Sequence, residues 1–137
     1  MPTPQLIDTN VLVRFFTGQP PDMALKAKTL VAEAEAGKVV LEVLPVIVAE
    51  TIYTLESFYG MDAGEVTEKL TSFIQGRGVQ AHERGRVLDA LNRHRDFNMH
   101  FADAYLAAAA LELECSVASF DRDFDKFDDI KRVEPGG

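Results

Sequence analysis

At 137 residues the chain is about one domain long, which is enough to bury roughly two-thirds of the surface that the unfolded chain exposes. A hydrophobic fraction of 47% is ordinary for a globular domain, and no run of about 18 apolar residues could cross a bilayer. One cysteine excludes an intrachain disulfide, and a net charge of −8 argues against a protein that coats nucleic acid. We expect a single domain over residues 1–137, no membrane association, a buried Cys115 and, because MPTPQ does not resemble a secretion signal, a cytoplasmic location.

Apolar periodicity in the chain alternates between strand and helix patterns. The first half predicts a strand at 5–7, a helix from about 11 that Gly18 ends, a helix at 22–36, a strand at 38–43, and helices at 45–58 and 62–74. The second half predicts helices at 83–95 and 101–114, a third strand at 116–118, a helical turn at 121–127 and an edge strand at 130–133. Strands separated by helices indicate an α/β sandwich with a mostly parallel sheet, because parallel strands need crossover connections.

Functional sites in such sheets lie beyond the carboxyl ends of the strands, and two aspartates stand there. Asp8 follows the first predicted strand, and Asp121 follows the third, with Ser119 beside it as a hydroxyl partner. Asp8-Thr9-Asn10 also has a structural explanation, since all three residue types are favoured helix N-caps. The triplet in isolation favours capping over catalysis.

Two further acids stand in apolar helices. Glu50, in "PVIVAETIYTL", is expected to be at least partly enclosed, because the first turns of its helix are apolar nearly all round. The alternatives are an ion pair with an arginine or a carboxylate turned to solvent opposite the apolar arc of Val48, Ile52 and Leu55. Asp103 is the only charge in "FADAYLAAAAL". It is either a carboxylate directed into a polar pocket or the N-cap of a helix that begins at residue 104.

The acid-rich segment 119–129 resembles a calcium loop superficially but lacks its glycine and final glutamate, so we exclude calcium. Carboxylates that gather at one sheet edge repel one another and persist only with shared protons or a divalent cation. Oxygen ligands without histidine or cysteine indicate Mg²⁺ or Mn²⁺. The four candidate ligands are Asp8, Glu50, Asp103 and Asp121.

Four segments carry a family resemblance: "LIDTNVLV", "VIVAETIYTL", "NMHFADAYLAAAA" and "VASFDRDF". Together, in this order, they resemble the motifs of PIN-domain ribonucleases, particularly the VapC-type toxins of prokaryotic toxin–antitoxin pairs. The resemblance implies a three-layer α/β/α fold, a Mg²⁺- or Mn²⁺-dependent endoribonuclease, a homodimer, and inhibition by a small antitoxin protein.

By position, the resemblance implies that Asp8, Glu50, Asp103 and Asp121 form the acidic site. Thr9 or Asn10 would orient Asp8 or a water, while Asp123 or Asp125 could share or take the fourth role. Metal ions there would activate a water for in-line attack on the phosphodiester and leave a 5′-phosphate.

Candidate contacts to the RNA backbone are Arg14 and the arginine-rich segment 77–95, in particular Arg84 and Arg86. This segment holds five arginines against two acids, and the alternative is a solvated helix face that balances acids elsewhere.

Two other functions remain open. A haloacid-dehalogenase-like phosphatase also begins with a strand-end aspartate, but it normally has a second aspartate two positions later, where this chain has Asn10. The third possibility is a non-catalytic binding domain of the same fold, which four occupied acidic positions disfavour.

Overall fold

The computed structural model describes residues 2–136. The chain divides into two compact units, with the boundary between Arg84 and Gly85. Its helices and strands occur in the order β-α-α-β-α-α-β in the first unit, followed by two long helices and two short strands with a 3-10 helix between them. The single domain expected over residues 1–137 stays a prediction.

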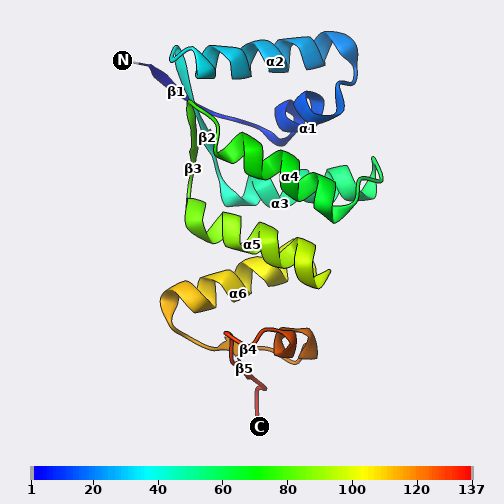
Figure 1. Ribbon diagram of the computed structural model, residues 1–137, viewed down its shortest axis with the longest axis vertical. Coiled ribbons are helices and arrows are strands. Elements are labelled where there is room, and N and C mark those ends of the chain that lie inside the picture. Colours follow the sequence, from blue (N-terminus) through cyan, green and yellow to red (C-terminus); the bar gives the residue numbers. More distant parts are fainter. Residues whose placement is uncertain (1, 137) are drawn as a thin grey trace. The chain divides into compact units, whose positions relative to one another are not determined.

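The first unit is a parallel sheet with helices on one side of it (Figure 1). Its elements are β1 (Thr3–Leu6), α1 (Thr9–Thr17), α2 (Pro21–Glu35), β2 (Val39–Val43), α3 (Pro45–Ser57), α4 (Ala63–Ile74) and β3 (Val79–Ala81). The strand order is β1-β2-β3, and both pairings are parallel, as expected from the alternating pattern. The register joins Leu6 to Glu42 and Val43 to Ala81, so the three carboxyl ends lie at one edge.

Local signals fix the ends of these helices. Pro21 and Pro45 occupy the first helical positions of α2 and α3, where the missing N–H costs nothing. The Asp62 side chain caps α4 by accepting a hydrogen bond from the Glu65 amide at 2.8 Å, as predicted. Gly18 ends α1 in the left-handed conformation, with φ of 72°. These boundaries agree with the sequence to within one or two residues.

The strand β3 was not predicted. Its three residues carry no usable alternation, and the third predicted strand, at 116–118, belongs to the other unit. Partner groups on β2 hold it instead: the Leu41 amide donates to the Gly78 carbonyl at 2.7 Å, and the His82 amide donates to the Val43 carbonyl at 2.9 Å. Pairing with an existing strand therefore defines β3, and no local sequence signal reports that.

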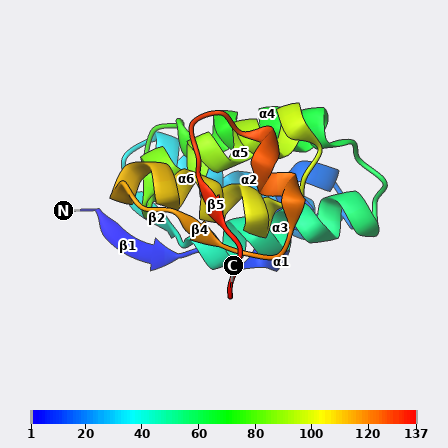
Figure 2. The ribbon, with the colours of Figure 1, turned by 90° about the horizontal axis from the view of Figure 1, so that it is seen from below.

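The second unit consists of two helices and a short parallel ladder (Figure 2). Its elements are α5 (Arg84–Phe97), which begins at the boundary, α6 (Phe101–Leu113), β4 (Val117–Ala118), the 3-10 helix η1 (Arg122–Lys126) and β5 (Arg132–Val133). The ladder joins Val117 to Arg132 and Ala118 to Val133. The expected helices, helical turn and edge strand are confirmed, but the strands form two sheets, whereas the sequence suggested one.

Apolar side chains are buried as the periodicities require. Leu12, Leu41 and Leu70 are fully buried in the first unit, and Val87 and Leu91 in the second. Cys115 is a correction: we expected a buried residue, but it lies just beyond α6 and is free and exposed. Among residues 2–136, no helix combines the length and apolar character that crossing a bilayer requires.

Gly78 provides a test of the first unit. Its φ is +77°, and a Cβ there would lie 2.7 Å from the carbonyl carbon of Ala34, at the end of α2. Gly78→Ala should lower the free energy of unfolding by more than the roughly 1 kcal/mol typical of a strained left-handed residue, because the α2 backbone must also move. Gly37→Ala is the matched control, since its φ is +80° with nothing within 4 Å. Equal losses in urea unfolding would show that the close approach to Ala34 is unimportant.

Candidate active site

Asp8 lies two residues beyond β1, as predicted, and caps α1 itself. Its Oδ1 accepts a hydrogen bond from the Thr9 amide at 2.8 Å. Of the three residues whose types favour capping, Asp8 is therefore the one that caps the helix. Asp8 is exposed, and among residues 2–136 its second carboxylate oxygen has no partner. Capping and ligand binding are thus compatible at Asp8.

Thr9 is buried at the first position of α1, and its Oγ1 has no hydrogen-bond partner in the part of the chain that the structure describes. A buried hydroxyl without a partner is costly, so such groups in native proteins usually meet a water, an ion or a ligand. Asn10, in contrast, is exposed. The supporting role implied for Thr9 therefore has an observation behind it.

Glu50 lies in α3 and is exposed, so the expected partial enclosure is wrong. The helix buries Val48, Ile52 and Leu55, together with Thr51, on the opposite arc. This is the alternative in which the carboxylate turns to solvent. The apolar neighbours of Glu50 in the sequence do not enclose it, because α3 leaves Val46 and Tyr53 exposed as well.

Asp103 is not an N-cap. The helix α6 begins at Phe101 with His100 at the cap position, which places Asp103 in the first turn. There the carboxylate is favoured by the positive end of the helix dipole. The side chain is half-buried and makes no hydrogen bond or ion pair within the described chain. Of the two interpretations, the structure agrees with the one in which the Asp103 carboxylate is available to a ligand.

Asp121 follows β4 and caps η1, repeating the arrangement at Asp8. Its Oδ1 accepts from the Asp123 amide at 2.9 Å, and its own amide donates to Ser119 Oγ at 2.9 Å. Ser119 is thus the hydroxyl partner that the sequence indicated, acting through the backbone. No cation pairs with the Asp121 carboxylate within residues 2–136.

The two competitors for the fourth role are engaged elsewhere. Asp125 accepts from Arg132 at 3.0 Å, and this hydrogen bond lowers the pKa of the Asp125 carboxyl. Asp123 lies 3.5 Å from the ammonium of Lys126. Of the three acids, Asp121 alone has a carboxylate without a cation, which favours it as the ligand.

The four predicted acids share one property: none forms an ion pair in the part of the chain that the structure describes. Asp8 and Glu50 belong to the first unit, and Asp103 and Asp121 to the second. Over residues 2–136, no three His, Cys, Asp or Glu side chains lie together in an arrangement that could hold a metal ion. Two of the predicted acids thus stand in each unit.

These residues fit Mg²⁺ or Mn²⁺ by their chemistry. Carboxylate oxygens are the hard donors that both ions prefer, and the orphaned Thr9 hydroxyl adds an oxygen next to Asp8. Neither histidine nor cysteine belongs to the set. A preference for zinc is therefore not expected.

Most arginines of the segment 77–95 pair with acidic side chains, as the alternative interpretation predicted. Arg86 donates to Glu112 at 3.1 Å and lies 5.7 Å from the ring centroid of Tyr105. Arg95 pairs with the adjacent Asp96 at 2.7 Å. Arg84, in contrast, is exposed and has no ion pair within the described residues. Of the two predicted RNA contacts in this segment, Arg84 is the one left available.

Arg93 has a structural role that the sequence did not reveal. It is buried, donates two hydrogen bonds to Asp129 at 3.0 and 2.7 Å and one to Asp89 at 3.0 Å, and its guanidinium lies 4.8 Å from the Phe127 ring centroid. Only the Asp89 contact, at i and i+4, was visible as helix spacing. Arg93 therefore ties α5 to the segment after η1.

The family is established by comparison with known proteins. The family model described as the PIN domain matches residues 6–130, and the chain therefore belongs to the PIN domain family. No curated protein matches the chain. PIN domains are generally nucleases and typically metal-dependent, so the family supports a hydrolase and does not favour the phosphatase.

Asp129→Asn tests the Arg93 ion pair. The hydrogen bond from Arg93 lowers the pKa of Asp129, so its stabilisation is present above about pH 4 and is lost as the pH falls through the lowered pKa. At neutral pH the variant should lose about 1 kcal/mol of unfolding free energy, a modest value because Asp129 is half-exposed.

Urea unfolding at pH 7 and near pH 2 measures this effect, and the difference between the two proteins should shrink at the lower pH. Asp96→Asn is the control, since Asp96 pairs only with the adjacent Arg95, which is itself exposed, whereas Asp129 pairs with a buried arginine, and its loss should be smaller. A pH-independent loss would assign the effect to packing.

Proposed function

We propose that the protein is a Mg²⁺- or Mn²⁺-dependent endoribonuclease, with Asp8, Glu50, Asp103 and Asp121 as the acidic ligands. The observation that carries the proposal is that all four motif acids fall within the matched residues 6–130 and that each has a carboxylate without a cation. Unpaired carboxylates at motif positions are what a divalent ion requires.

When bound, the divalent cation supplies Lewis acidity and lowers the pKa of a water near the scissile phosphate. The chain's own backbone amides orient two of the acidic side chains. Asp8 is fixed by the bond from the Thr9 amide to Oδ1, which leaves Oδ2 for a ligand. Asp121 is fixed in the same way through the Asp123 amide. Both carboxylates are therefore oriented before any ligand binds.

The biological role and partners are part of the same proposal. The four motif segments resemble VapC-type toxins, so we propose a toxin that is neutralised by a small cognate antitoxin protein and that forms a homodimer. Because the chain is acidic overall, we expect it to contact its RNA substrate through a few basic side chains and not through a broad basic surface.

Asp8→Asn and Asp103→Asn should each lower Mn²⁺-dependent cleavage of RNA by on the order of 10²-fold or more, because each removes a charged ligand. Asparagine is as good an N-cap as aspartate, so Asp8→Asn should keep α1 and the fold. The measurement is cleavage of a panel of tRNA, rRNA and mRNA fragments, with circular dichroism as the check of folding.

Asp128→Asn is the matched control, since this exposed aspartate lies outside the motifs and should leave the rate unchanged. EDTA should abolish cleavage by the wild-type chain. Full activity in EDTA, or in both ligand variants, contradicts a metal nuclease. Release of phosphate from small phosphomonoesters without RNA cleavage would favour the phosphatase, and folded chains that bind RNA without cutting it would favour a binding domain.

The fourth acid has its own test. Asp121→Asn should abolish cleavage while retaining the η1 cap, whereas Asp123→Asn and Asp125→Asn should keep most of the activity. Asp125→Asn should mainly disturb the ion pair with Arg132. If Asp125→Asn is inactive and folded while Asp121→Asn is active, the fourth ligand is Asp125.

A further inference from the structure

A groove of about 350 Å³ lies between α1 and α2 in the first unit. From α1 it is lined by Asn10, Val11 and Arg14, which share one helical face at spacings of three and four residues. Asn10 is two positions beyond Asp8, the cap of the same helix. The groove thus begins beside the first of the proposed acidic ligands.

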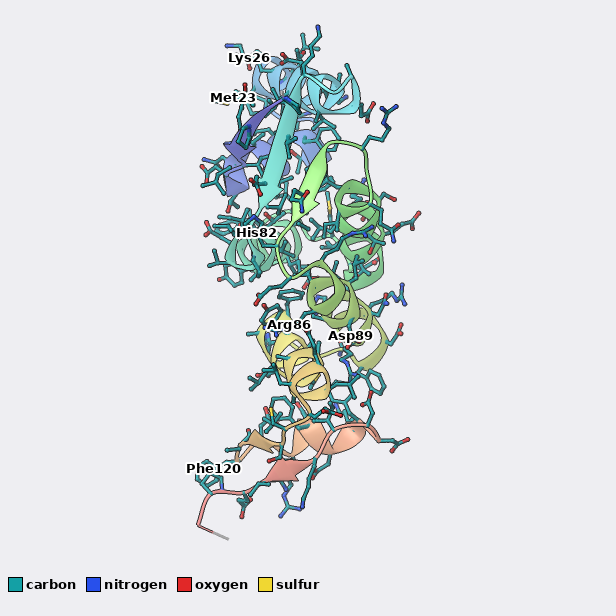
Figure 3. The ribbon with its side chains drawn as sticks, turned by 90° about the vertical axis from the view of Figure 1, so that its left-hand side faces the viewer. Met23, Lys26, His82, Arg86, Asp89 and Phe120 are labelled. Atoms are coloured by element: carbon teal, nitrogen blue, oxygen red, sulfur yellow. The ribbon has the colours of Figure 1, made fainter. Side chains whose placement is uncertain are left out.

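From α2 the groove receives Met23, Lys26 and Leu30, over a floor formed by Ala27. Figure 3 shows Met23 and Lys26 projecting from the same side of α2. Met23 is 52% exposed, and a flexible methionine adapts to irregular apolar ligands. The lining is therefore mostly apolar, with cations at Arg14 and Lys26.

Neither cation is neutralised. Lys26 has no ion pair within the described residues, although Asp22 stands four positions earlier on α2. Arg14 makes only two long contacts, both 3.4 Å, to the Gln19 carbonyl and the Tyr59 hydroxyl. In a chain with 22 acids and 14 basic residues, this groove presents two cations and no acidic lining residue.

Another groove of the first unit, of about 560 Å³, differs in its charge. Glu35, Glu65 and Glu68 line it together with Lys69 and Arg77, beside the contacting rings of Phe15, Phe16 and Phe73. Three acids against two cations would repel a phosphate backbone. This contrast supplies a control groove on the same unit.

We propose that the α1–α2 groove binds single-stranded RNA, with Arg14 and Lys26 contacting backbone phosphates and Met23 and Leu30 contacting the apolar faces of a base or ribose. Single-stranded RNA presents both chemistries along one strand, and the positions on α1 would lead that strand toward Asp8. The inference rests on the proposed ribonuclease function and names the residues by which the substrate is held.

The test is the salt dependence of RNA binding. A short fluorescein-labelled single-stranded RNA is titrated with the full chain in EDTA, at several KCl concentrations, with anisotropy as the readout. Each lost phosphate contact should reduce the slope of log K against log salt by about 0.7. Arg14→Ala and Lys26→Ala should each show this reduction, and Lys26→Arg should restore the wild-type slope.

Met23→Ala should weaken binding at every salt concentration without changing the slope, because it removes an apolar contact. Lys28→Ala, on α2 but outside this groove, and Lys69→Ala, in the acidic groove, are the matched controls and should leave the slope unchanged. Unchanged slopes for both Arg14→Ala and Lys26→Ala overturn the proposal. Binding of poly-L-glutamate that depends on Lys26 and exceeds RNA binding also overturns it, in favour of an acidic peptide.

Failure of the groove and failure of the nuclease are distinguishable. Asp8→Asn should bind RNA in EDTA at least as tightly as the wild type, because it removes a negative charge, yet fail to cut RNA with Mn²⁺. If the slopes change but the wild-type chain does not cleave RNA, the groove proposal holds and the ribonuclease proposal is wrong. If the wild-type chain cleaves RNA but the slopes of both cation variants are unchanged, the ribonuclease proposal holds and the groove proposal is wrong.

Discussion

The parallel pairing of β1 with β2 is the constraint on which the N-terminal half of the proposed site depends. The register joins Leu6 to Glu42, and the Ile7 amide donates to the Glu42 carbonyl at 3.1 Å. The chain leaves the sheet at the next residue, so Ile7 is buried while Asp8 is exposed and begins α1. A shift of one residue would exchange these two side chains and bury the acid. The same register therefore determines the exposure of Asp8, the start of α1 and the face of α1 that lines the proposed RNA groove.

Asp8 and Asp121 use one carboxylate in two ways. In each case Oδ1 accepts a backbone N–H at the start of a helical segment, at 2.8 Å and 2.9 Å, and Oδ2 has no partner in the described chain. A carboxylate offers about four acceptor positions, so capping leaves capacity for a cation. The alternatives of cap and ligand that the sequence posed are thus not exclusive. The cap supplies orientation, and the remaining oxygen supplies the ligand.

Strong local signals made most of the fold predictable. Pro45, Asp62 and Gly18 mark helix ends through backbone chemistry, and the alanine-rich segment around Asp103 could only be a helix. The strand β3 escaped because its existence depends on the partner groups of β2. The exposure of Glu50 was not predicted because helical periodicity says which residues share a face but not which face is covered. The exposure of Cys115 was not predicted because its expected burial rested on residue type alone. Long-range pairs such as Arg93 with Asp129 leave no trace in local spacing.

The exposed thiol of Cys115 bears on how self-association must be measured. It is the chain's only cysteine, so oxidation in air can link two chains through one disulfide and can build nothing larger. A covalent dimer formed in this way would have the mass of the proposed homodimer and would persist at any dilution. Only a dimer that survives reductant and dissociates with dilution is held by a non-covalent interface, and Cys115→Ser would give that answer without reductant.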